Sequence, residues 1–362
     1  MLSPALPLHA PAPDVTALPL TALQQHVALA AQTRGGLVES IHYGSLIATA
    51  PDSGAQDPDA PDPAGHDGLR TLLSAGDPLA PFYPRSALKP LQAVALVGAG
   101  LDLPADLLAL TAASHSGAAM HRDGALRILQ IHGLTADALE NSTDLPHGVG
   151  EREEWLRDGG QATQLTQNCS GKHASMAATC VINGWPVRGY LDPGHPLQQL
   201  VAQTVRDLTG EEPSRATTDG CGTPLFALTL RGMARAFGRL ASAEMNGAPA
   251  ESPEAAVAHA MRRHPEMVAG EGRDVTELMR LAPGLLAKDG FEGVQLVGLP
   301  DGRAVAVKIS DGGDRARMPV TVRALEALGV DTAPLAGIAT GSVLGGGRPV
   351  GELTATDFLT AH

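Results

Sequence analysis

The chain has 362 residues, of which 43% are hydrophobic and 18% are charged, and its formal net charge at pH 7 is -13. This composition predicts a globular protein with enough chain for one large domain or two moderate ones. The negative charge argues against nucleic acid or an anionic membrane as a partner, and the sequence lacks the run of about 18 apolar residues that a membrane-spanning helix needs.

Residues 1–33 are rich in proline and alanine, and we expect them to form a flexible tail. They lack the basic region of a secretory signal. Together with an odd number of cysteines, three, this predicts a cytoplasmic protein without a disulfide framework. Where the tail ends, the segment 20–36 (LTALQQHVALAAQTRGG) predicts a short helix that stops at glycine.

A hairpin follows. Residues 37–49 alternate and are rich in β-branched side chains, which is typical of a strand. Residues 51–68 are rich in Asp, Pro and Gly, and we expect them to form a mobile loop. Residues 68–78 predict the returning strand.

Most of the chain between residues 85 and 286 predicts helices. Six segments carry apolar residues at three- and four-residue spacing, and several end in Gly or Asn. These segments are 87–100, 104–117, 123–134, 171–184, 196–210 and 224–243.

The C-terminal part returns to strand patterns. Residues 293–310 (GVQLVGLPDGRAVAVKIS) predict a hairpin with its turn at Pro300, Asp301 and Gly302. A helix is expected around 318–330, and 348–356 predict an edge strand.

These elements predict an α/β fold of the α+β type. An antiparallel sheet built from both chain ends (34–84 and 287–362) would be flanked by helices, with a mainly helical lobe (85–286) inserted between them. We expect a single domain over 34–362, with a cleft between the two lobes as the place for a site.

The segment 82–92 (FYPRSALKPLQ) combines a hydroxyl, an amine and two prolines. Pro90 is tolerated only in a first helical turn, so the helix should begin near Ser86, with Lys89 one turn later. An ammonium among apolar side chains loses hydration, which favours the neutral amine, and an amine beside a hydroxyl suits acyl transfer. The alternative is that Ser86 is an ordinary helix cap.

Two further motifs extend this pattern. ASHSG contains Ser114 and Ser116 at the end of a predicted helix, and KDG contains Lys288 just before the predicted strand 293–299. The order S-x-x-K, S-x-S, K-x-G is that of the serine β-lactamase and penicillin-binding-protein site. The alternatives are polar side chains on a helix C-terminus and a solvated turn lysine.

The cysteines leave three interpretations open. Cys180 lies in an apolar helix and is expected to be inert core. Cys169 and Lys172 lie one turn apart if a helix starts at Ser170 or Gly171, with His173 adjacent, and Cys221 lies in a turn-rich segment. They could be buried thiols, a cysteine nucleophile at a helix N-terminus, or a metal site with a nitrogen ligand.

Six blocks, taken together, resemble the signature blocks of the asparaginase II family, the class 3 L-asparaginases. The resemblance runs from about residue 34 to about residue 355. The blocks are VESIHYGS (38–45), PFYPRSALKPLQA (81–93), ASHSG (113–117), QNCSGKHASM (167–176), TDGCGTPLFAL (218–228) and AKDGFEGV (287–294).

The resemblance implies a fold similar to serine β-lactamases and glutaminases, and a homodimer that hydrolyses L-asparagine to L-aspartate and ammonia. Carried over by position, it implies Ser86 with Lys89 as the first catalytic pair and Ser114 with Lys288 as the second. Ser116 is the alternative to Ser114 and is otherwise expected in the substrate pocket.

The same resemblance implies a zinc site and further pocket residues. Cys169, Lys172 and Cys221 match the family's zinc ligands, with a water as the fourth. Arg85 and His173 match residues that line the substrate pocket.

Other functions stay open beside this one. A glutaminase or a β-lactam- or peptide-directed serine hydrolase could share the fold. A cysteine amidase would use Cys169 as its nucleophile. A protein of another class, a zinc-binding scaffold without catalysis, would use the serines only as helix caps.

Overall fold

A computed structural model of the chain describes residues 25–52, 68–244, 246–247, 249 and 252–359. The predicted tail up to residue 24 and the core of the predicted 51–68 loop lie outside the described residues. In the described part, no helix is both long and apolar enough to cross a bilayer.

The centre of the fold is an eight-stranded sheet in which every pairing is antiparallel. Its order is β6-β7-β8-β2-β1-β10-β9, and β3 also pairs with β2. Its strands are β1 Val27–Arg34, β2 Leu37–Pro51, β3 Leu69–Ala75, β6 Leu286–Gly290, β7 Val294–Gly298, β8 Ala304–Ile309, β9 Gly341–Gly345 and β10 Arg348–Ala355. Strands β4 Arg215–Thr218 and β5 Pro224–Ala227 form a separate pair.

The strands from both chain ends therefore pair in one sheet, which confirms the predicted architecture. Two details differ. The helix predicted over 20–36 is wrong, because the alanine-rich segment from Val27 is a strand paired with β2 on one side and β10 on the other. The strand at 348–356 is not an edge, because β9 pairs beyond it. Hydrogen bonding to a strand on each side overrides the helical preference of alanine.

The segment between β3 and β6 is mainly helical, as predicted. Its helices are α1 Lys89–Gly98, α2 Ala105–Thr111, α3 Ala119–Ile131, α4 Val149–Arg157, α5 Ser170–Ile182, α6 Pro196–Thr209, α7 Leu230–Ser242, α8 Pro253–Arg263, α9 Pro265–Val268 and α10 Asp274–Leu281. Residues 224–243 are not one helix, since their first part is strand β5. Helices α11 Arg317–Ala327 and α12 Ala336–Ala339 lie between β8 and β9 in the chain. The described 3-10 turns are η3 Arg85–Leu88, η4 Ala136–Ala138, η5 Asp314–Ala316 and η6 Ala333–Leu335.

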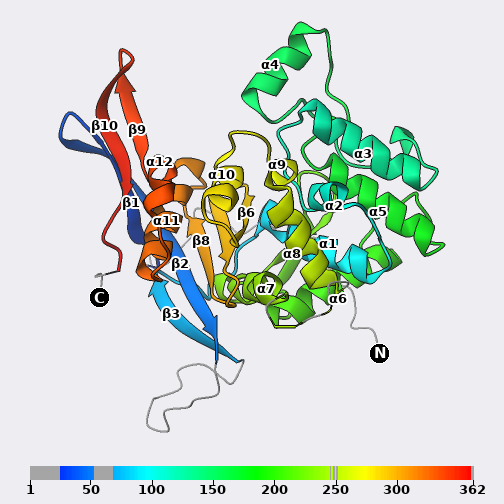
Figure 1. The fold of residues 1–362 in the computed structure, drawn as a ribbon, viewed down its shortest axis with the longest axis horizontal. Helices are drawn as coiled ribbons and strands as arrows, with labels where there is room; N and C mark the ends of the chain where they lie inside the picture. Colours follow the sequence, from blue (N-terminus) through cyan, green and yellow to red (C-terminus); the bar gives the residue numbers. More distant parts are fainter. Residues whose placement is uncertain (1–24, 53–67, 245, 248, 250–251, 360–362) are drawn as a thin grey trace, which may run out of the picture.

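Helices cover both faces of the central strands. Helix α7 packs on β2, β7 and β8, while α11 packs on β7, β8 and β10 from the other side (Figure 1). Every residue of β7 is buried, as expected for a strand covered on two faces.

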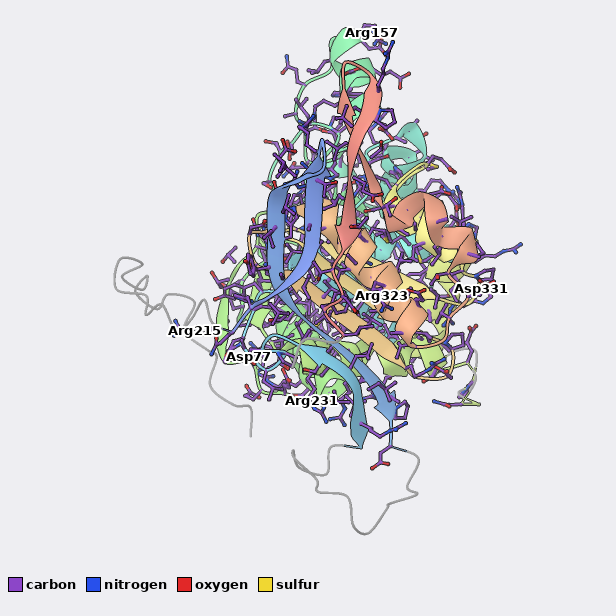
Figure 2. All side chains as sticks on the ribbon, turned by 90° about the vertical axis from the view of Figure 1, so that its left-hand side faces the viewer. Asp77, Arg157, Arg215, Arg231, Arg323 and Asp331 are labelled. Carbon is purple, nitrogen blue, oxygen red and sulfur yellow. The ribbon has the colours of Figure 1, made fainter. Side chains whose placement is uncertain are left out.

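Helix α4 is nine residues long, and none of them is buried, a property that it shares only with the short helix α12 among the described helices. Figure 1 shows α4 at the top of the molecule. In Figure 2 its last residue, Arg157, is labelled at the top, far from Arg231 near the lower end of the sheet. Polar contacts hold it, including a cation–π contact of 4.6 Å between Arg122 and Trp155.

Candidate active site

The Ser86 turn begins the helical insert. Residues 85–88 form the 3-10 turn η3, and α1 begins only at Lys89, with Pro90 in its first turn as predicted. The α-helix therefore starts three residues later than expected, because the chain first tightens into a 3-10 turn. Arg85 has a φ of 51°, a conformation that costs a non-glycine residue energy and that concentrates at functional sites.

The amine of Lys89 lies against a different serine from the one the sequence pairs it with. Its Nζ donates to Ala113 O at 2.5 Å and lies 3.0 Å from Ser114 Oγ. Among the described residues, no hydrogen bond joins it to Ser86 Oγ. Both Ser86 and Lys89 are buried, so the pair is inside the protein rather than at a solvated helix end.

Lys288 reaches the same hydroxyl from the sheet. Its Nζ donates to Ser114 Oγ at 3.0 Å and is fully buried on the edge strand β6, so it is neither a turn lysine nor solvated. Burial lowers the pKa of Lys288 to about 8, although Asp289 opposes the shift. Ser114 is therefore held between two buried amines.

Gly290 explains how the Ser86 turn comes so close to the sheet. A Cβ at this position would lie 2.4 Å from Pro84 O and 3.2 Å from Ala87 N. The absence of a side chain therefore lets η3 pack directly on β6. The K-D-G sequence supplies both the amine and this close approach.

The loop that carries Ser114 is fixed by its backbone. Ser114 N donates to Val268 O, and Ser116 N donates to Ala269 O. The Ser116 hydroxyl points elsewhere, since its Oγ donates to Glu151 Oε1 at 2.5 Å. The structure thus places Ser114, and not Ser116, between the lysines.

The cysteine cluster forms around the start of α5. Cys169 precedes this helix, which begins at Ser170, so Lys172 lies one turn further on, as predicted. Lys172 Nζ lies 3.1 Å from Cys221 Sγ and 3.0 Å from Thr223 Oγ1. Cys169, Lys172 and Cys221 are all buried and come from two parts of the chain, the start of α5 and the segment between β4 and β5, whereas Cys180 lies apart in the core.

The two thiols interact with each other. Hydrogen bonding to Cys221, and then burial, raise the pKa of the Cys169 thiol well above its usual value. The same bond lowers the pKa of Cys221 despite its burial. Burial alone would lower the pKa of Lys172, but the charges of Cys221 and Cys169 outweigh it and raise the pKa.

These donors fit a zinc ion. Zn–S and Zn–N bonds of about 2.3 and 2.1 Å in tetrahedral geometry put two ligand atoms roughly 3.6 Å apart, and Lys172 Nζ lies 3.1 Å from Cys221 Sγ, so these two atoms would separate slightly to hold the ion. Within the described ranges, no three His, Cys, Asp or Glu side chains come together as metal ligands. A site with three protein ligands would therefore need the amine of Lys172.

His173 lies beside this cluster in the interior. Its Nδ1 hydrogen-bonds to the hydroxyl of Tyr190 at 2.9 Å, and its Nε2 has no hydrogen-bond partner in the described part of the chain. Burial, followed by the charge of Lys172, lowers its pKa to about 4, so the ring is neutral at pH 7. Lys89 also acts on this ring, which shows that the two clusters adjoin.

Arg85 lies at the more open side of the arrangement, with a quarter of its side chain exposed (27%). Its Nε donates to Asp219 Oδ1 at 2.8 Å, and its guanidinium lies 5.8 Å from the centre of the Phe291 ring. Its Nη1 also lies 3.9 Å from Oε1 of the exposed Glu292, so a substrate anion at this guanidinium would share it with Asp219 and compete with Glu292.

Three contacting residues were missed by the sequence analysis: Asp219, Thr223 and Asp289. Each lies within two positions of a residue that the motifs identify, Cys221 or Lys288. The blocks quoted above contain them, but neither spacing nor residue type predicts that Asp219 contacts Arg85 or that Asp289 contacts Lys288.

Lysine itself is rare in this chain. The sequence contains only Lys89, Lys172, Lys288 and Lys308 among its 26 basic residues. The first three are at most 1% exposed and belong to the two clusters. Arginine thus supplies nearly all the surface positive charge, and lysine is concentrated where an amine is buried.

Comparison with known proteins agrees with the resemblance of the six sequence blocks to the asparaginase II family. The family model described as L-asparaginase II matches residues 30–355. Comparison with curated proteins finds no significant match. The solved structures found include Mglu in its glutamate form (15% identity, 79% of this chain and 60% of that chain, TM-score 0.33) and Mglu in its tris and glutamate form (16% identity, 88% and 67%, TM-score 0.32). The chain spans about 60% of the length of the first of these. The match over most of its length shows that the chain belongs to the L-asparaginase II family.

Proposed function

We propose that the protein is an L-asparaginase that hydrolyses the side-chain amide of L-asparagine to L-aspartate and ammonia through a serine ester. The observation that carries this proposal is the arrangement Lys89–Ser114–Lys288, with both amines 3.0 Å from one hydroxyl, next to the Ser86 turn. Two buried amines around a hydroxyl can move protons without an imidazole.

Ser86 Oγ attacks the amide carbon and forms a C–O bond, and its proton passes to Lys89. The carbonyl oxygen becomes an oxyanion, which backbone N–H groups stabilise, among them that of Ser86. When the C–N bond breaks, Lys89 returns the proton through the hydroxyl of Ser114 to the leaving nitrogen, which departs as ammonia, while Lys288 stays charged beside Ser114. A water then hydrolyses the aspartyl ester and regenerates Ser86.

Arg85 is the proposed partner of the substrate's α-carboxylate. It precedes the nucleophile directly, and its strained backbone and its bond to Asp219 fix the direction of its guanidinium. His173 and Ser116 are proposed pocket residues, His173 from the thiol side and Ser116 through its bond to Glu151.

Zinc would be held by Cys169, Lys172 and Cys221. Bound to two thiolates and an amine it would retain little Lewis acidity, so it would supply order to the pocket and an attraction for polar substrate atoms. Lys172 must then be neutral, while Thr223, which contacts Lys172 and Cys221, would hold the ligands in place.

The homodimer and the cytoplasmic location remain proposals. Three free, buried cysteines support a reducing compartment. A glutaminase is the second candidate function, because one methylene of substrate is worth only about 1–3 kcal/mol of discrimination in a pocket.

The test is ammonia release from L-asparagine and, in parallel, from L-glutamine. We expect the zinc-loaded wild type to prefer asparagine, and Ser86→Ala to lose turnover by at least about 10³-fold while it remains folded. Ser310→Ala, at an exposed serine in the turn just after β8, is the control and should keep full activity. Rapid acid quench and peptide mass spectrometry should locate the aspartyl ester on Ser86.

Each rival function has its own outcome in this assay. Activity retained in Ser86→Ala but lost with iodoacetamide would assign Cys169 as the nucleophile. Nitrocefin turnover without amide turnover would indicate a β-lactam-directed enzyme. Zinc retention without any hydrolysis would indicate a scaffold.

A further inference from the structure

Asp289 is a buried carboxylate in contact with Lys288. Its Oδ1 lies 2.5 Å from Lys288 Nζ, and its Oδ2 lies 3.2 Å from a terminal nitrogen of Arg273. Burial alone would raise the pKa of Asp289, but the charges of Lys288, Arg317 and Arg273 hold it far below its usual range. Asp289 is therefore ionised whenever the protein is folded near neutral pH.

The contacts of Lys288 are those of an ammonium. Its Nζ has three acceptors: Ser114 Oγ at 3.0 Å, Asp289 O at 2.8 Å and Asp289 Oδ1 at 2.5 Å. An ammonium has three N–H donors and no acceptor, so all three acceptors are satisfied only when Lys288 is charged. When Lys288 is charged, Ser114 Oγ accepts a hydrogen bond from its Nζ and cannot donate its own proton to Lys288.

The other side of Ser114 faces Lys89. The Ser114 hydroxyl has one proton to donate, and a charged Lys288 cannot receive it. The nitrogen of Lys89 lies 3.0 Å away; a charged Lys89 would donate to Ser114 Oγ, whereas a neutral Lys89 can accept that proton. Lys89 has Ala113 O as its second contact, and no carboxylate within the described ranges bonds to it.

We propose that Asp289 is a positioning residue that keeps Lys288 charged against Ser114 and so directs the hydroxyl proton of Ser114 toward Lys89. This inference rests on the proposed function only for the direction of proton transfer. It assigns the two lysines different roles: Lys288 is the fixed cation, and Lys89 is the group that exchanges a proton.

The charged groups around Lys288 act in opposite directions. Burial lowers its pKa most, Asp289 raises it, and Arg273 before α10 and, whenever it is protonated, Lys89 on α1 lower it. Arg317 on α11 acts on Asp289, and His147 interacts with both Asp289 and Arg273. Removing Asp289 should therefore lower the pKa of Lys288, whereas removing the charge of Arg273 should raise it.

The first experiment compares the alkaline limb of kcat/KM. Activity requires charged Lys288, so it should fall as the pH rises through the Lys288 pKa of about 8. Asp289→Asn should move this limb to lower pH and reduce kcat roughly 10- to 100-fold with a smaller change in KM. Arg273→Gln should move the limb to higher pH.

The matched control is Asp274→Asn. Asp274 forms an ion pair of the same kind, at 2.8 Å with Arg317, but does not touch Lys288. We expect its alkaline limb to coincide with that of the wild type. Limbs that stay in place in both Asp289→Asn and Arg273→Gln, or that move in the same direction, would overturn the proposal.

The second experiment needs no activity. Lysine labelled with ¹³C at Cε gives only four side-chain signals, because the chain has four lysines. One signal should titrate near pH 8, with its midpoint lowered by Asp289→Asn and raised by Arg273→Gln. If these shifts occur but asparagine is not hydrolysed, the proposed function fails and the role of Asp289 stands.

Folding is followed by thermal unfolding in each variant. If Asp289→Asn does not fold, Asp289→Glu keeps the charge and should retain the wild-type titration midpoint and most of kcat. Two results would contradict the proposal. One is a folded Asp289→Glu variant in which the titration midpoint of Lys288 and kcat both fall. The other is an Arg273→Gln variant in which this midpoint does not move upward.

Discussion

Lys288 and Lys172 are the same residue type, are equally buried, and lie in adjoining clusters, yet their pKa values shift in opposite directions. Beside one carboxylate and a hydroxyl, burial prevails and lowers the pKa of Lys288 to about 8. Beside two thiols, the sulfur charges prevail and raise the pKa of Lys172. In the oxygen cluster the positive charge of Lys288 therefore depends on Asp289, whereas the sulfur cluster itself favours a positive charge, whether that charge is an ammonium or a metal ion.

The largest effect expected from this comparison comes from Ser114→Ala. It removes the hydroxyl shared by Lys89 and Lys288, so turnover of asparagine should fall about 10³-fold. Its zinc content should equal that of the wild type, because Ser114 contacts neither thiol. Ammonia assays and metal analysis on the same sample measure both. Loss of zinc in this variant would show that the two clusters are one unit.

Cys221→Ala tests the sulfur side. It removes one of three proposed ligands, so zinc content should drop from about one ion per chain to less than about a tenth after dialysis. Cys180→Ala is the matched control, since Cys180 is equally buried but lies in the core, and it should keep its zinc. Equal zinc in wild type and Cys221→Ala would remove the metal from this site.

Gly290→Ala should have a smaller effect on activity, because it changes only the distance between the Ser86 turn and the sheet. The added Cβ would meet Pro84 O at 2.4 Å and push the Ser86 turn away from β6, which should lower the free energy of unfolding by about 1–3 kcal/mol and reduce kcat. Gly150→Ala, where nothing lies within 4 Å, should change stability by less than about 1 kcal/mol. Urea unfolding of both variants measures the difference. Similar stability of the Gly290→Ala and Gly150→Ala variants would mean that η3 can shift away from β6 without a loss in the free energy of unfolding.

Much of the fold could be predicted from local patterns. The alternation in 37–49 and the Pro-Asp-Gly turn at 300–302 encode strands that need little help from the rest of the chain. The strand from Val27 was misjudged, because its alanines favour a helix until two neighbouring strands supply hydrogen bonds. Pairing across more than 300 residues leaves no local signal.

In the candidate site, too, local sequence predicts some features and contacts between distant segments decide the others. Pro90 and the Ser170 helix start fix where Lys89, Lys172 and Cys169 lie along their helices, and the sequence contains that information. Which hydroxyl each amine faces depends on contacts between distant segments. Lys89 was expected beside Ser86, three positions away, but bonds to Ser114 on the following loop.

The scarcity of lysine has a practical consequence for handling the protein. Reagents that acylate amines, including those used to attach polymers or to fix enzymes on a support, react with accessible lysine side chains. Here three of the four lysines are buried in the interior, and only Lys308 is partly exposed. Changing one surface arginine, such as Arg323, to lysine would give a chosen attachment point, with little competing modification of the catalytic amines while the protein stays folded.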